Sequence, residues 1–148
     1  MSIQFKSIVE LRAMLDKKSI STPELTQESL RLAKKYKELN CFVTMNEEMG
    51  PKKASAIELD KKTTSLISGI PLAQKDLFCT EGLRTTCSSK ILENFIPPYT
   101  ATAVKKLEDA GSITIGKTNM DEFAMGSSNE TSYFGNVHNP WKKGYVPG

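Results

Sequence analysis

The fold class of this 148-residue chain is indicated first by the stretch Gly69-Ile70-Pro71-Leu72-Ala73-Gln74-Lys75-Asp76. It reads as an apolar β-strand, and its proline predicts either the start of the strand or a sheet edge. A helix predicted over 100–110, with Gly111 as its C′ residue, leads to a second buried strand over 112–116. Strand, helix and strand in this order predict parallel pairing and an α/β fold.

The sequence before this unit predicts mainly helices. Ser21-Thr22-Pro23-Glu24 forms a capping box with proline in the first turn, and the helix that it opens is expected to end near Asn40. Loose helical spacing also follows Ser7. We further predict a short strand over 41–44, a helix over 52–60 and a polar connection over 61–65.

Composition excludes several classes of protein. The net charge of +3 is small, and the basic residues are scattered, which argues against nucleic-acid binding. No apolar run approaches the roughly 18 residues that a membrane helix needs, so we expect no membrane association. The first six residues contain no apolar segment of a secretory signal. Three cysteines, an odd number without a signal, are expected to be free thiols of a cytoplasmic protein.

Lys75 is the first candidate for chemistry because it closes the apolar strand. Its neighbours Ile70, Leu72 and Ala73 predict low solvent exposure around it. Burial penalises the charged form of an amine, and a lysine that is neutral near pH 7 can act as a base. The alternative is a strand-end lysine that extends to water. Asp76 would either orient Lys75 or only cap the strand.

A second candidate region is the stretch 119–132, which places small, polar and hydrogen-bonding residues directly after a predicted strand. Loops of this kind hold binding and catalytic residues in α/β folds. Composition alone supports a binding or catalytic loop and a plain surface loop equally.

Other polar residues favour structural roles. His138 lies among turn residues without a metal-ligating partner, and Cys79 and Cys87 have poor spacing for zinc. Ser88 and Ser89 lack a nucleophile elbow and are expected to stabilise a turn. The adjacent carboxylates Asp121 and Glu122 diverge on a helix, which argues against a paired-carboxylate mechanism.

Several motifs together resemble the amidase signature family. They are Gly69-Ile70-Pro71 with Lys75-Asp76, the run Thr-Thr-Cys-Ser-Ser-Lys over 85–90, the run from Ile115 to Gly126, Asn139-Pro140-Trp141 and Val146-Pro147-Gly148. Within that family, Asn119–Gly126 followed by Glu130-Thr131-Ser132 is typical of the glutaminase (A-type) subunits of the Glu-tRNA(Gln)/Asp-tRNA(Asn) amidotransferases. The resemblance covers the whole chain but only about the first third of a typical subunit of this type.

The resemblance implies the start of a single amidase signature domain, with a helical part over 1–62 and the beginning of the core over 63–148. The expected fold is α/β: N-terminal helices, then part of a mixed β-sheet flanked by helices. Family members use a Ser–Ser–Lys arrangement in which lysine activates a bridging serine, and Lys75 matches that lysine. Met125, Gly126 and Ser127 match a loop beside the substrate pocket.

Both catalytic serines and the oxyanion-hole amides of the family match segments that would follow Val146-Pro147-Gly148, so neither serine is present here. We therefore expect the chain alone to be inactive. The parent activity would be hydrolysis of glutamine to ammonia within a heterotrimer with the B and C subunits, which amidates mischarged tRNA. ATP and Mg²⁺ are expected in the partner subunit, and no cofactor in this chain. This agrees with the absence of a Gly-x-x-x-x-Gly-Lys-Ser/Thr phosphate loop.

Two alternatives remain open at this point. One is the corresponding part of a generic amidase that acts on a small amide. The other is a non-catalytic, truncated remnant whose only capacity is contact with other subunits. The polypeptide that follows Gly148, if rich in glycine and with two spaced serines, would favour an enzyme.

Overall fold

The computed structural model describes residues 3–59 and 65–148. In chain order these contain helix α1 (Ile8–Asp16), helix α2 (Thr22–Lys35), strand β1 (Phe42–Met45), helix α3 (Met49–Leu59), strand β2 (Pro71–Lys75), helix α4 (Thr102–Asp109) and strand β3 (Ile113–Thr118). Short 3₁₀ turns follow α2, the 76–89 segment and β3; they are η1 (Lys37–Leu39), η2 (Lys90–Leu92) and η3 (Glu122–Ala124).

The three strands form one mixed sheet in the order β1-β3-β2. β2 pairs in parallel with β3, and Lys75 lies opposite Thr118. β1 pairs antiparallel with β3 on the other side, and Met45 lies opposite Gly116. The predicted α/β fold and the parallel pairing are therefore confirmed. β2 begins at Pro71 and lies at an edge of this sheet, as its proline predicted.

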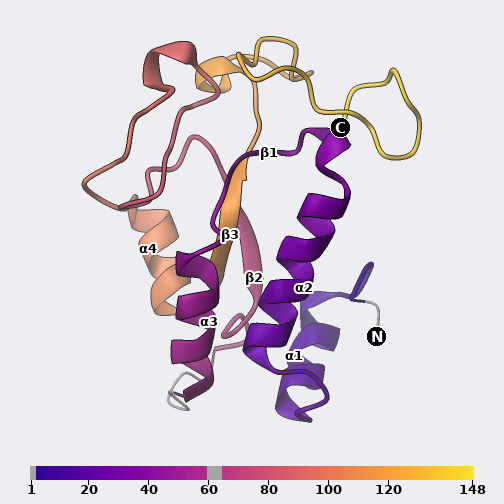
Figure 1. The fold of residues 1–148 in the computed structure, drawn as a ribbon, viewed down its shortest axis with the longest axis vertical. Helices are drawn as coiled ribbons and strands as arrows, with labels where there is room; N and C mark the ends of the chain where they lie inside the picture. The colour runs from indigo at the N-terminus through magenta and orange to yellow at the C-terminus, as the bar shows by residue number, and fades with distance from the viewer. Residues whose placement is uncertain (1–2, 60–64) are drawn as a thin grey trace.

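β3 is the central strand of the sheet, and its residues are mostly buried. Five of its six residues are buried, which is the pattern of a strand covered on both faces. β1 approaches β3 so closely that a Cβ on Gly116 would lie 2.6 Å from the carbonyl oxygen of Thr44. Helices α2 and α3 pack on each other and both contact β3. Figure 1 shows the loops of 76–100 and 119–148 gathered at the same end of the sheet.

Two capping boxes start the N-terminal helices. The hydroxyl of Ser21 accepts from the amide of Glu24, whose carboxylate accepts from the amide of Ser21, as the sequence predicted. Ser7 and Glu10 form the same motif at the start of α1. The buried side chains of Leu15, Leu25 and Ile70 then join α1, α2 and the approach to β2 in one apolar cluster.

Element boundaries differ from the sequence predictions by a few residues. α3 begins at Met49, ahead of the predicted start at 52, and β3 extends two residues beyond 116 to Thr118. Gly111 has a φ of +89°, which suits its predicted place after α4. Most of the predicted polar connection over 61–65 lies outside the described residues. The division into 1–62 and 63–148 stays a prediction. None of the described helices is long and apolar enough to cross a membrane.

Candidate functional site

A hollow of about 260 Å³ lies where the parallel strands end. Lys75 is the last residue of β2, and Asn119 directly follows β3. The carboxyl ends of parallel strands are where α/β proteins place their ligands. The residues lining the hollow are Lys75, Asn119, Met120, Asp121, Ala124, Gly126, Ser127, Ser128, Asn129 and Pro147. The structure thus brings Lys75 together with Gly126 and Ser127, whereas Met125 is not among the lining residues and its side chain is 73% exposed.

The prediction that Lys75 is buried is wrong for this chain. Ala73 and Lys75 are exposed, whereas Gln74 and Asp76 are buried. Successive side chains of a strand point to opposite faces, so Ala73 and Lys75 share the open face of the edge strand β2. The apolar residue types around Lys75 predicted burial, but the described residues leave this face of β2 exposed.

Asp76 fixes the turn over 86–88. Its carboxylate is fully buried and accepts hydrogen bonds from the backbone amide of Thr86 at 3.1 Å and from the amide of Ser88 at 3.2 Å. It also accepts from the hydroxyl of Thr86 at 2.5 Å. The backbone carbonyl of Asp76 accepts from the amide of Cys87. Asp76 therefore holds a turn next to the pocket, a role that neither sequence alternative described.

Ser88 and Ser89 stabilise that turn, as the sequence predicted. Both side chains are fully buried. The hydroxyl of Ser88 donates to Oδ1 of Asn119 at 3.1 Å and accepts from the amide of Met120 at 3.1 Å. The hydroxyl of Ser89 donates to Glu122 at 2.5 Å. These bonds join the 86–89 turn to the loop after β3.

The loop that carries Gly126 and Ser127 folds around the carboxylate of Asp121. This carboxylate accepts from the amide of Asn129 at 2.8 Å and from the amide and hydroxyl of Thr131. The amide of Asn129 is the main cause that lowers the pKa of Asp121. A Cβ on Gly126 would lie 2.6 Å from each carboxylate oxygen of Asp121, so a larger residue would force the loop or the carboxylate to move. Asp121 and Glu122 bind different partners, as expected.

Lys117 is a buried lysine that the local sequence patterns did not single out. It lies in β3 and is fully buried, and burial lowers its pKa while the Asp76 carboxylate opposes that effect. On burial alone, Lys117 rather than Lys75 would be the candidate for a neutral base. However, its ammonium donates to the carbonyl of Phe78 and the hydroxyls of Thr80 and Thr85, and it does not line the hollow. The predicted strand ended at Gly116, whereas β3 continues through Lys117 to Thr118.

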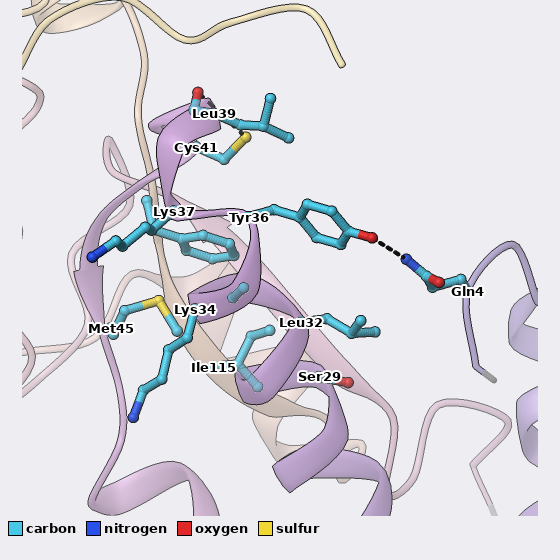
Figure 2. A pocket seen from close by; sticks show the side chains of 12 residues that line it. Gln4, Ser29, Leu32, Lys34, Tyr36, Lys37, Leu39, Cys41, Met45 and Ile115 are labelled. Carbon is cyan, nitrogen blue, oxygen red and sulfur yellow. Dashed lines mark hydrogen bonds between the residues drawn. The ribbon is translucent and has the colours of Figure 1, made fainter. Parts of the chain in front are cut away.

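A larger hollow of about 380 Å³ lies between the end of α2 and β1 (Figure 2). Its lining is mainly apolar, including Leu32, Leu39, Met45 and Ile115. The amide of Gln4 donates to the Tyr36 hydroxyl at its rim. Its nucleophilic candidates are poor: the hydroxyl of Ser29 donates to the backbone carbonyl of Leu25, and burial raises the pKa of the Cys41 thiol. The hollow with Lys75 is therefore the better candidate for reaction chemistry.

The other candidates keep the roles that the sequence favoured. His138 is exposed, and its backbone amide donates to the carbonyl of Leu39. Cys41, Cys79 and Cys87 are free thiols. Burial raises the pKa of Cys87, which makes it a poor nucleophile. Among residues 3–59 and 65–148, no group of three or more His, Cys, Asp or Glu residues is placed to hold a metal ion.

Comparisons with known proteins agree on one family. A family model described as Amidase matches residues 24–148. The A subunit of the Glutamyl-tRNA(Gln) amidotransferase of Hahella chejuensis is 50% identical over 145 residues, which are 96% of this chain and 30% of that protein. The protein of the same name from Coxiella burnetii is 53% identical over 146 residues, again 30% of its length. The chain thus spans about 30% of the length of these relatives.

Solved structures show the same likeness. The crystal structure of the Glutamyl-tRNA(Gln) amidotransferase A subunit from Thermotoga maritima has a TM-score of 0.82 and 36% identity, and the match covers 100% of this chain and 30% of that one. The native peptide amidase from Stenotrophomonas maltophilia has a TM-score of 0.85 and 26% identity, with 95% and 31% covered.

Proposed function

Because this chain belongs to the amidase family, we propose that it supplies the general base of a glutamine-hydrolysing subunit of a tRNA-dependent amidotransferase. The observation that carries this proposal is the shared hollow of Lys75, Gly126 and Ser127 at the ends of the parallel strands. A positioned amine beside a rigid loop is what a lysine-based acyl transfer needs.

Sequence identity favours glutamine over other amides as the substrate. Identity is 50–53% to the amidotransferase subunits of Hahella chejuensis and Coxiella burnetii, and 26% to the peptide amidase. The backbone does not separate the two classes, because TM-scores are 0.82 for the Thermotoga maritima subunit and 0.85 for the peptide amidase. A small-amide amidase is therefore the second candidate, and the non-catalytic remnant is the third.

In the proposed reaction, neutral Nζ of Lys75 takes a proton from a bridging serine, which takes the proton of a nucleophilic serine. The nucleophilic oxygen forms a bond to the side-chain amide carbon of glutamine, the carbon–nitrogen bond breaks, and ammonia leaves with the returned proton. Water then hydrolyses the acyl-enzyme to glutamate. Both serines would come from polypeptide outside these 148 residues.

The same further polypeptide would cover Lys75. The open face of β2 leaves Lys75 in water here, and the relatives extend well beyond the 30% that this chain spans. Packing against this face would exclude water from Lys75, which its role as a base requires. We assign ATP, Mg²⁺ and most tRNA contacts to a partner subunit in a heterotrimer with B and C subunits.

A hybrid subunit tests the function. This chain replaces the matching 30% of the Hahella chejuensis relative, which is then combined with the other subunits of that complex. We expect the hybrid to release ammonia from glutamine and to amidate Glu-tRNA(Gln), with much weaker hydrolysis of a peptide amide. The 148-residue chain alone is the control, and we expect it to release no ammonia because it lacks the nucleophile.

The three candidates give different results. Preferred hydrolysis of the peptide amide would support the generic amidase. A hybrid that folds and assembles, but hydrolyses neither substrate, would support the non-catalytic remnant.

A further inference from the structure

Lys117 is held by three acceptors that belong to one short segment. Its ammonium donates to the carbonyl oxygen of Phe78 and, at 3.1 Å each, to the hydroxyls of Thr80 and Thr85. An ammonium has three protons to donate, and a buried one is costly unless they are accepted. The fully buried Lys117 therefore ties the 78–85 segment to the central strand β3.

The Asp76 carboxylate holds the continuation of that segment. It is fully buried and accepts from the amides of Thr86 and Ser88. Its negative charge favours the ammonium form of Lys117 and so offsets part of the burial cost. Two buried charges of opposite sign thus fix the two halves of the 78–88 segment.

Lys117 and Asp76 both lie close to Lys75, because Lys117 pairs across the sheet with Gln74, the residue before Lys75. Lys75 directly precedes Asp76, and the amide of Asp76 donates to the carbonyl of Thr118, the neighbour of Lys117 in β3. The 86–88 turn also contacts the loop that lines the hollow, because the amide of Phe123 in that loop donates to the carbonyl of Cys87. The same network of buried hydrogen bonds therefore supports both Lys75 and the loop that lines the hollow at Gly126 and Ser127.

We propose that Lys117 is a positioning residue for Lys75: it fixes the 78–85 segment and thereby the direction in which Lys75 leaves β2 toward the wall of Gly126 and Ser127. This inference rests on the proposed function, because the importance of that direction depends on the role of Lys75 as a base. Lys117 does not itself line the hollow, and its protons already have acceptors.

The first experiment measures amide hydrogen exchange in the 148-residue chain. Lys117→Met removes the charge and shortens the side chain by one heavy atom, and Thr85→Val is a milder variant that removes one acceptor. We expect Lys117→Met to accelerate exchange at Thr86 and Ser88 about tenfold or more, relative to amides of α2 such as Leu25. Thr85→Val should change the same amides by a smaller factor.

Lys53→Met is the matched control for this experiment, since Lys53 is a half-buried lysine of α3 that pairs with Glu108 at 3.4 Å. It should leave the amides of Thr86 and Ser88 unchanged relative to α2. Exchange that is unchanged in Lys117→Met and Thr85→Val, or that rises equally in α2, would overturn the proposal.

The second experiment uses the hybrid subunit and separates positioning from folding. We expect Lys117→Met to lower kcat for glutamine hydrolysis about 10- to 100-fold, while KM for glutamine changes less than about threefold. Amidation driven by free ammonium should stay at its wild-type rate. An equal loss in the ammonium-driven reaction, or an unchanged kcat, would overturn the positioning role. A wild-type hybrid that hydrolyses no glutamine would contradict the proposed function instead, and hydrogen exchange would then decide whether Lys117 anchors the segment.

Discussion

The hydroxyl of Ser88 donates to Oδ1 of Asn119, 31 positions later in the chain, over 3.1 Å. Asn119 lines the hollow with Lys75, and Ser88 belongs to the turn that Asp76 holds. The same Asn119 oxygen accepts from the hydroxyl of Ser132 at 2.7 Å. One amide oxygen thus joins the 86–89 turn to both ends of the 119–132 loop, so the residues that line the hollow depend on the turn after Lys75.

Ser88→Ala should destabilise this junction. The change removes the bond to Asn119 and one acceptor of the buried Met120 amide, which costs about 1–2 kcal/mol in the free energy of unfolding. For a chain of this size, that corresponds to a fall in Tm of roughly 3–8 °C. Thermal unfolding followed by circular dichroism measures it. Ser127→Ala, at an exposed position, is the control and should leave Tm unchanged. Equal Tm values for the two variants would contradict the structural role of Ser88.

Gly126→Ala should displace the wall of the hollow. The new Cβ would meet the Asp121 carboxylate oxygens at 2.6 Å, so either the loop or the carboxylate must move. Overpacking of this kind costs about 1–3 kcal/mol. Urea unfolding gives the loss of stability, and amide chemical shifts of Asn129 and Thr131 report the displacement. Gly148→Ala adds a Cβ in open space and should change neither quantity. Unshifted Asn129 and Thr131 amides in Gly126→Ala would show that the loop accepts the extra atom without moving.

Stability should fall in acid. The amide of Asn129 lowers the pKa of Asp121 from its ordinary value of 3.8, and the capping amides of Ser7 and Ser21 lower the pKa values of Glu10 and Glu24 from 4.5. Carboxylates with lowered folded-state pKa values add stability that is complete above their ordinary pKa values and is lost as the pH falls through the lower ones. Urea unfolding between about pH 7 and pH 2.5 measures this loss. Asp121→Asn should be less stable at pH 7 and should lose less on acidification; an identical pH dependence would contradict this.

The open edge strand β2 should make the chain prone to self-association. Ala73 and Lys75 lie on its open face, and large apolar side chains such as Ile91 and Trp141 are 82% and 81% exposed. An unpaired strand edge is a template for pairing with another chain. We expect binding of the dye ANS and a sedimentation coefficient that rises with protein concentration. A sedimentation coefficient that does not change with concentration would count against this.

Local signals in the sequence predicted the secondary structure well. The capping box of Ser21 and the proline of β2 act within a few residues of themselves, so their effects could be read directly. Parallel pairing followed from element order, and the structural roles of Ser88 and Ser89 followed from the missing nucleophile elbow. These predictions did not depend on knowing which segments meet in space.

The errors concern contacts between distant segments. The burial of Lys75 was inferred from its apolar neighbours, but exposure depends on what covers the edge strand β2. Lys117 was missed because its acceptors Thr80 and Thr85 lie more than 30 positions away. Asp76 finds its partners 10 and 12 positions later, in a turn whose geometry no local pattern predicted. Met125 adjoins the hollow in sequence, but its side chain points to solvent.

The most direct test of the base assignment is substitution of Lys75 in the hybrid subunit. Lys75→Ala removes the base, and Lys75→Arg keeps a cation that retains its proton at every accessible pH. Lys105→Ala, at an exposed lysine of α4 away from the hollow, is the control. Rates of glutamine-driven and ammonium-driven amidation of Glu-tRNA(Gln) are measured for each variant. We predict that both Lys75 variants lose about 10²–10⁴-fold in the glutamine-driven rate and retain the ammonium-driven rate. Equal losses in both rates, or a glutamine-driven rate near that of the unmodified hybrid, would contradict the assignment of Lys75 as the base.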